Sequence, residues 1–146
     1  MKAIIAILML TGATAFCCGN YGNLQLQTHE EVVSMHLEAI KQGNKKLLGA
    51  AWDTDKAQII EIKNGVSQKM DVNKTFDVWT KTKNPDLNPK IISTTKITEE
   101  IAVAKVSLNW KGSHYVEMLT LVKNKGFWKI VGKTYKAPRS APIYGG

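Results

Sequence analysis

The sequence is poor in the residues that most often carry disulfide, metal or nucleophilic chemistry. Its two cysteines are the adjacent Cys17 and Cys18, and neighbouring thiols cannot link distant parts of a fold, which excludes a disulfide framework. Without nearby histidines they also do not form a zinc site. No serine or cysteine nucleophile motif and no metal-ligand spacing of His, Asp or Glu is present. We therefore expect no metal and no cofactor, and we assign no catalytic residue.

Arginine is almost absent as well. The formal net charge is +8, but Arg139 is the sole arginine among 20 basic residues, and the lysines are scattered along the chain. Proteins that read nucleic acids rely on arginine for paired contacts to phosphate and guanine. We therefore expect no nucleic-acid partner and interpret the charge as a contribution to solubility.

Long hydrophobic runs are missing too, because the apolar run near the N-terminus is too short to span a bilayer. Lys2 precedes an apolar run from Ala3 to Leu10, and Ala13-Thr14-Ala15 follows as a small-residue cleavage site. This pattern predicts a signal peptide at residues 1–15, with cleavage placed as late as residue 18, and export to the periplasm or the medium. The alternative is that the mature chain carries a lipid anchor at Cys17 or Cys18.

The first helix has clear boundaries. Thr28 and Glu31 form a capping-box pattern, and Gly43 marks the end of the helix. Apolar residues recur between them at helical spacing, with His36 in the middle of the stripe. His36 is either a satisfied core histidine or a hydrogen-bonding group on the floor of a pocket. Asn44 begins a second, shorter helix that extends to Trp52.

The middle of the chain alternates strands and turns. We expect a hairpin of residues 57–63 and 66–72 around Asn64-Gly65, then a helix capped by Asn73 or Thr75 that carries Trp79. Two prolines, Pro85 and Pro89, bracket a loop. Further strands follow at residues 90–98 and 101–110.

The last two strands, within residues 114–135, form the most distinctive segment. A three-residue loop at 124–126 would place Glu117 directly opposite Lys133, on the face that also carries Tyr115 and Tyr135. Trp128 and Ile130 fall on the opposite face of their strand, which we expect to pack inward. The lysine face is then wetter or lines a cavity.

Helices followed by strands predict an α+β fold with the helices packed on one face of the sheet. Residues 24–136 resemble the nuclear transport factor 2-like superfamily (the cystatin-like α+β cone), in particular its bacterial putative lumazine-binding branch. The resemblance is carried by residues 39–44 and 48–52, by Trp79, and by the segments YVEMLTL at 115–121 and GFWKIVGK at 126–133. Residues 137–146 are then a flexible tail.

The resemblance implies a curved antiparallel sheet wrapped around N-terminal helices, cone-shaped with an internal cavity, and a homodimer formed through the outer face of the sheet. Together with the predicted signal peptide, the resemblance favours an exported domain that binds a small, partly aromatic or anionic ligand in the cavity. The candidate ligand-binding residues are His36, Trp52, Trp79, Tyr115, Glu117, Lys133 and Tyr135. Two alternatives remain open: an isomerase- or dehydratase-like enzyme using Glu117 or His36, and a dimeric interaction module without a ligand.

Overall fold

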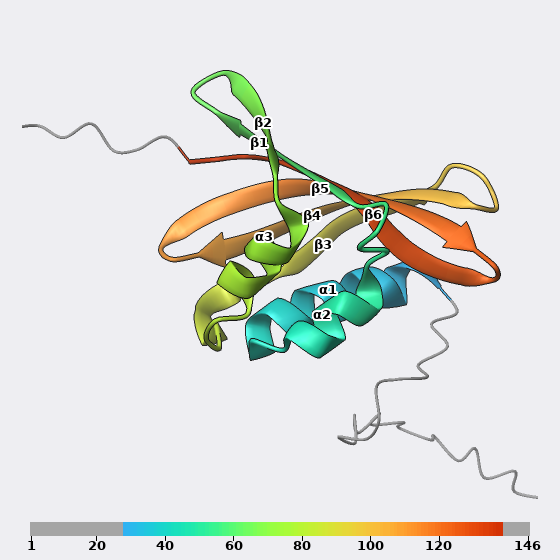
Figure 1. Ribbon diagram of the computed structural model, residues 1–146, viewed down its shortest axis with the longest axis horizontal. Helices are drawn as coiled ribbons and strands as arrows, with labels where there is room; N and C mark the ends of the chain where they lie inside the picture. Colours follow the sequence, from blue (N-terminus) through green and yellow to red (C-terminus); the bar gives the residue numbers. More distant parts are fainter. Residues whose placement is uncertain (1–27, 139–146) are drawn as a thin grey trace, which may run out of the picture.

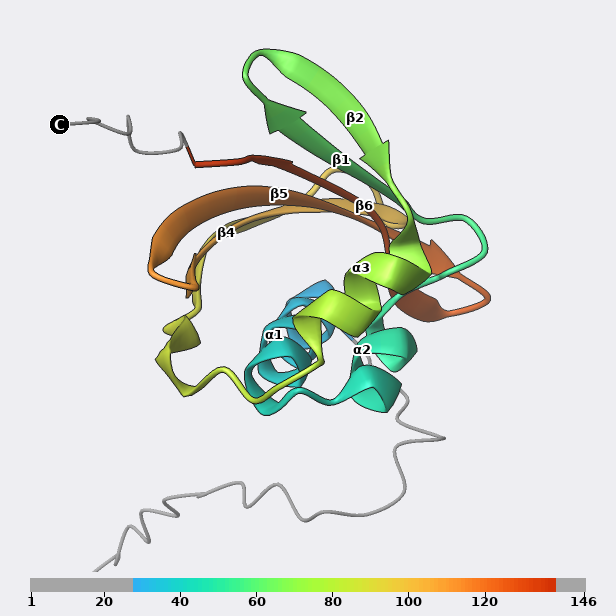
Figure 2. The same ribbon diagram turned by 60° about the vertical axis from the view of Figure 1, so that its left-hand side comes forward.

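The structure is a computed structural model in which residues 28–138 are described. Figures 1 and 2 show a curved sheet whose concave side covers the helices. The elements, in chain order, are α1 (His29–Gln42), α2 (Lys45–Ala51), β1 (Gln58–Lys63), β2 (Val66–Met70), α3 (Val72–Trp79), the short 3-10 helix η2 (Pro85–Leu87), β3 (Lys90–Lys96), β4 (Ile101–Trp110), β5 (Ser113–Asn124) and β6 (Phe127–Lys136). The predicted α+β class is confirmed. None of the helices in this part of the chain has the length and apolarity needed to cross a membrane.

The six strands lie in the order β2-β1-β6-β5-β4-β3. Neighbours pair antiparallel except β1 and β6, which run parallel with Ile59 beside Lys133 and Glu61 beside Tyr135. This pairing makes the sheet mixed rather than wholly antiparallel. It also joins the β1–β2 hairpin to β6, the last strand in the described part of the chain, as Figure 2 shows.

The ends of α1 and α2 follow from their capping residues. The Thr28 side chain accepts the N–H of Glu31, and the Glu31 carboxylate accepts the N–H of Thr28, so the predicted capping box is confirmed. Gly43 ends α1 with φ of 64°, a left-handed conformation that glycine adopts at little cost. The Asn44 side chain then caps α2 by accepting the N–H of Leu47.

The N-terminal cap of α3 differs from the prediction. Asp71, rather than Asn73 or Thr75, caps the helix, because its carboxylate accepts the N–H of Lys74. The Thr75 hydroxyl instead donates to the Asp71 carbonyl from inside the first turn. The preceding strand therefore ends at Met70, two residues before the predicted end at 72.

The β5–β6 turn also differs from the prediction. The loop is the two-residue Lys125-Gly126, with φ of 50° and 85°, and Asn124 pairs with Phe127. Positive φ at both turn positions matches the right-handed twist of the flanking strands, which favours this tighter connection. The expected three-residue loop is therefore wrong, as is the register built on it.

A β-bulge changes which side chains of β6 face inward. Thr120 pairs with Gly132 while Leu121 pairs with Ile130, so Val131 is an extra residue without a partner on β5. Trp128 and Ile130 are buried before the bulge, and Lys133 is buried after it. The predicted separation of Lys133 from the Trp128 face therefore fails, because the bulge brings both to the concave side.

His29, the first residue of α1, is mostly buried. Its ring lies 5.4 Å from that of Trp128, and its Nε2 lies 2.9 Å from Glu30 Oε1. The predicted signal peptide, Cys17, Cys18 and residues 139–146 of the predicted tail lie outside the described residues.

Candidate functional site

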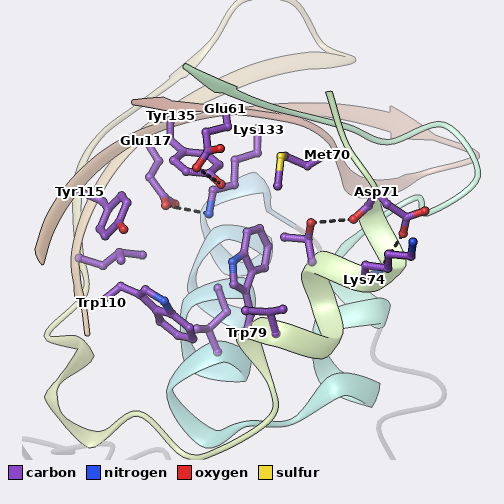
Figure 3. Close-up of a pocket in the computed structure, with 14 residues that line it drawn as sticks. Glu61, Met70, Asp71, Lys74, Trp79, Trp110, Tyr115, Glu117, Lys133 and Tyr135 are labelled. Carbon is purple, nitrogen blue, oxygen red and sulfur yellow. Dashed lines mark hydrogen bonds and ion pairs between the residues drawn. The ribbon is translucent and has the colours of Figure 1, made fainter. Parts of the chain in front are cut away.

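A pocket of about 340 Å³ opens between the concave face of the sheet and α3 (Figure 3). It falls within the usual size range of small-molecule sites, roughly 300–1,000 Å³. The lining comes from α1, α3, β1, β2, β4, β5 and β6: Ile40, Glu61, Met70, Asp71, Lys74, Thr75, Val78, Trp79, Leu108, Trp110, Tyr115, Glu117, Lys133 and Tyr135. Asp71, Lys74 and Val78 are exposed and mark its mouth, whereas Glu117 and Lys133 are buried.

The polar centre of the pocket is an ion pair. Lys133 Nζ lies 2.7 Å from Glu117 Oε1, and the two side chains are only 2% and 4% exposed. The pair does not arise as predicted, because Glu117 faces Tyr135 and Lys133 faces Leu119 across the ladder. The residues are diagonal neighbours, and such neighbours on one face remain within reach of long side chains.

Lys133 is held by more than Glu117. Its ammonium lies 3.8 Å from the centroid of the Trp79 ring and 5.1 Å from that of Tyr135. A cation over an aromatic face is attracted by the electrons of the ring, and the attraction grows when water is excluded. Burial lowers the pKa of Lys133, while the charge of Glu117 and the hydrogen bond to it oppose that shift.

One of the two carboxylate oxygens of Glu117 lacks a hydrogen-bond partner among residues 28–138. This atom, Oε2, is buried. A buried carboxylate oxygen without a partner is costly, since the charge has lost water and gained no donor in exchange. This oxygen is therefore an acceptor available to a molecule in the pocket.

Two tyrosines form the wall beside this pair. The rings of Tyr115 and Tyr135 lie edge to face at 6.1 Å, and the Tyr135 hydroxyl donates to Glu61 Oε1 at 3.3 Å. Burial, together with Glu61 and Glu117, raises the pKa of Tyr115. Burial and the neighbouring Glu61 raise the pKa of Tyr135 as well. Both hydroxyls therefore keep their protons and can donate.

His36 and Trp52 belong to the core rather than to the pocket lining. The Trp52 indole N–H donates to His36 Nδ1 at 3.1 Å, and His36 is fully buried. Both rings pack against Trp79, at centroid distances of 5.9 and 6.4 Å. The predicted burial of His36 is confirmed, and its hydrogen-bond partner is Trp52 at the end of α2 rather than a group in the pocket. Burial, and secondarily Lys133, holds the pKa of His36 well below its usual value.

Of the predicted site residues, the structure places Trp79, Tyr115, Glu117, Lys133 and Tyr135 together around the pocket. Sequence reasoning missed Glu61 and Trp110. Trp110 shares the buried face of β4 with Leu108, and Glu61 shares a face of β1 with the buried Ile59, so alternation along each strand was a usable signal. Within residues 28–138, no three His, Cys, Asp or Glu side chains gather into a metal site.

Comparison with known proteins places these features in context. The sequence profile of the family described as Putative lumazine-binding matches residues 25–136. No curated protein matches the chain.

Solved structures with the same fold share little sequence. A protein of unknown function from Shewanella baltica, described as NTF2-like, is 21% identical with a TM-score of 0.66, over 76% of this chain and 91% of that one. An NTF-2-like protein of unknown function from Silicibacter pomeroyi is 21% identical with a TM-score of 0.64, over 73% and 89% of the two chains. A ketosteroid isomerase-like protein from Erwinia carotovora atroseptica is 14% identical with a TM-score of 0.56, over 80% and 99%. At these identities the likeness shows the fold alone.

Proposed function

The chain belongs to the Putative lumazine-binding family, whose profile covers residues 25–136, and from that membership we propose that it is a domain that binds a small, flat ligand in the pocket between β5, β6 and α3. The family description names a small heterocycle, and the solved relatives supply the fold. Neither assigns a reaction to this chain.

One observation carries the proposal: a buried ion pair lies at a pocket walled by aromatic rings, and one of its carboxylate oxygens has no hydrogen-bond partner among residues 28–138. Ligand sites typically combine apolar and aromatic walls with a few placed polar groups. Trp79, Trp110, Tyr115 and Tyr135 supply the walls here, and Glu117 supplies the polar group (Figure 3).

The alternative function, an isomerase- or dehydratase-like enzyme, was predicted to use Glu117 or His36, and one of these two residues lines the pocket. His36 does not line the pocket, whereas Glu117 does. An enzyme of this kind would have to use the same carboxylate oxygen as its base, so it too requires ligand binding at this site.

The test is binding of flat aromatic compounds, followed by the indole N–H signals of the tryptophans in two-dimensional NMR. We expect saturable shifts of the Trp79 and Trp110 signals, and we expect Trp110→Leu to weaken binding because it removes one wall. Phe127→Leu is the matched control, since Phe127 is a half-exposed aromatic residue that does not line the pocket. Equal loss of binding in both variants, or shifts that spare Trp79 and Trp110, would argue against this function.

We further propose that two copies pair through the convex face of the sheet. Val116 and Met118 on the outer face of β5 are 44% and 45% exposed. Apolar side chains gathered on one face favour association. Sedimentation should give a dimer for the unaltered chain and a monomer for Met118→Glu, while Val66→Glu on β2 leaves the dimer intact. A monomeric unaltered chain contradicts the proposal.

We also propose export, on the basis of residues 1–15 alone. Mass spectrometry of the native protein should find a chain that begins near Phe16 or a few residues later. An intact Met1 on the mature protein contradicts export by this signal.

A further inference from the structure

We propose that the ligand is a neutral, flat ring that presents an N–H next to a C=O, as a lactam, an imide or an aromatic amide does, with the N–H donating to Glu117 Oε2 and the C=O accepting from the Tyr115 hydroxyl. This inference rests on the proposed function and specifies the ligand class of the same pocket. It assigns Lys133 to positioning Glu117 and not to holding an anion.

The need for a donor follows from Glu117. Its Oε1 already accepts from Lys133 at 2.7 Å, whereas its Oε2 is buried without a partner among residues 28–138. An ionised carboxylate only accepts hydrogen bonds. A ligand therefore satisfies Oε2 by bringing an N–H or O–H to it.

The case against an anionic ligand follows from the charges around the pocket. Lys133 is enclosed by Glu117 on one side and by the face of Trp79 on another. Three carboxylates line the pocket, those of Glu61, Asp71 and Glu117, against the two ammonium groups of Lys74 and Lys133. A ligand carboxylate or phosphate beside Oε2 would meet a like charge in a place with little water to screen it.

The acceptor on the ligand follows from Tyr115. Tyr115 lies two residues before Glu117 on β5, so both side chains point to the concave face (Figure 3). The hydroxyl of Tyr135 is already used by Glu61, whereas that of Tyr115 makes no hydrogen bond within the described part of the chain. Glu61 and Glu117 both disfavour its ionisation, so it stays a donor. An acceptor and a donor therefore project from the same face of β5, two residues apart, and this pair suits a ligand with an N–H beside a C=O.

Two matched pairs of probes test the proposal on the unaltered chain by calorimetry near pH 6.5. Lumazine carries two ring N–H groups, each next to a carbonyl, and 1,3-dimethyllumazine has the same rings with those hydrogens replaced by methyl groups. A hydrogen bond to a charged acceptor is lost in the second compound, so we expect it to bind on the order of 10–100-fold more weakly. In the second pair, 2-naphthamide should bind at least about tenfold more tightly than 2-naphthoate, which offers no donor and carries a negative charge.

Two variants locate the effect. Tyr115→Phe removes the donor to the ligand carbonyl and should weaken lumazine binding roughly 3–10-fold, with Phe127→Leu unchanged as the control. Glu117→Gln, checked for native folding by circular dichroism, should reduce the preference for lumazine over its dimethyl form to less than about threefold, because the charged acceptor is gone.

The outcomes separate the two proposals. If 1,3-dimethyllumazine binds as tightly as lumazine, or 2-naphthoate as tightly as 2-naphthamide, this inference is overturned while ligand binding stands. If none of the four compounds binds, the proposed function falls and the inference falls with it. If the preferences hold but survive in both variants, the donor and acceptor assigned to the chain are wrong.

Discussion

Glu117 and Lys133 form a buried ion pair at 2.7 Å although they do not face each other across the β5–β6 ladder. The bulge at Val131 makes the contact possible. In a regular ladder from Ile130 onward, Thr120 would pair with Val131 and the Lys133 side chain would turn to the convex face. One extra residue in β6 therefore decides whether the pocket has a buried cation.

The energy of this pair can be measured with Glu117→Gln, Lys133→Met and the double variant. Each single change leaves a charge or a polar group buried without its partner, which costs on the order of 3–5 kcal/mol for a buried pair. The double variant should lose clearly less than the sum of the two. Urea unfolding monitored by circular dichroism gives the three values. A coupling energy of zero would mean that the two side chains do not interact in solution.

Deletion of single residues in β6 tests the role of the bulge. Deleting Val131 should keep Thr120 beside Gly132 and Leu119 beside Lys133, because Val131 has no partner on β5. We expect a folded protein with the ion pair intact and a loss within the ordinary range of about 0.5–3 kcal/mol.

Deleting the exposed Thr134 is the control for Val131. It should cost more, because it turns Tyr135 away from the concave face and disrupts its pairing with Glu61 of β1. Thermal unfolding ranks the two deletions, and the opposite order would contradict this account of the bulge.

Much of the local structure was readable from the sequence because it depends on neighbouring residues. Thr28 with Glu31 fixes the start of α1, and Gly43 fixes its end. The β5–β6 hairpin was recognisable, but its register was not, because a turn shorter by one residue and a bulge both shift it. Gly132 within the strand was a usable signal for the bulge, since glycine inside a strand often marks one.

Only the part of the pocket formed by β5 and β6 could be predicted from the sequence. Lys133, Tyr135, Tyr115 and Glu117 share one hairpin, so alternation could bring them together. Glu61 reaches Tyr135 only through the parallel pairing of β1 with β6, which joins segments more than half the domain apart. No local pattern specifies such a partner. His36 shows the converse limit: its place on the apolar stripe predicted burial but not Trp52 as its partner.

His36 should make stability depend on pH. Burial, and then Lys133, lowers the pKa of His36 well below its usual value near 6.5. The unfolded chain therefore binds this proton at a higher pH than the folded chain does. The stabilising contribution is complete above about pH 6.5 and is lost as pH falls toward the folded pKa, at up to about 1.4 kcal/mol per pH unit.

The check is the free energy of unfolding between pH 7.5 and 5, compared with His36→Gln. Glutamine retains an acceptor for the Trp52 N–H but does not titrate, so its curve should fall less steeply with decreasing pH. If the free energies of unfolding of the two proteins fall equally with pH, His36 has the same pKa in the folded and unfolded chains, which contradicts this prediction.

Substitutions at Gly43 and Gly126 distinguish two destabilising effects of an added side chain, backbone strain at positive φ and steric overlap with a neighbour. Both have positive φ, at 64° and 85°, but a Cβ on Gly43 would lie 2.8 Å from the Thr82 carbonyl oxygen, whereas one on Gly126 would meet open space. Gly126→Ala should cost only the left-handed backbone term, about 1–2 kcal/mol. Gly43→Ala should cost clearly more, because backbone must move as well. Chemical denaturation measures both, and equal losses would show that the loop at Thr82 shifts freely.

The parallel joining of β1 to β6 also sets an order of events in folding. Among the strands of residues 28–138, the β1–β2 hairpin pairs only with β6, which is the last of these strands to leave a ribosome. An isolated two-stranded hairpin is barely stable in water. The helices and the β3–β5 strands can therefore begin to assemble while this hairpin still lacks its docking edge. Closing so long a loop is slow, so we expect the Glu61 side of the pocket to gain its hydrogen-exchange protection last.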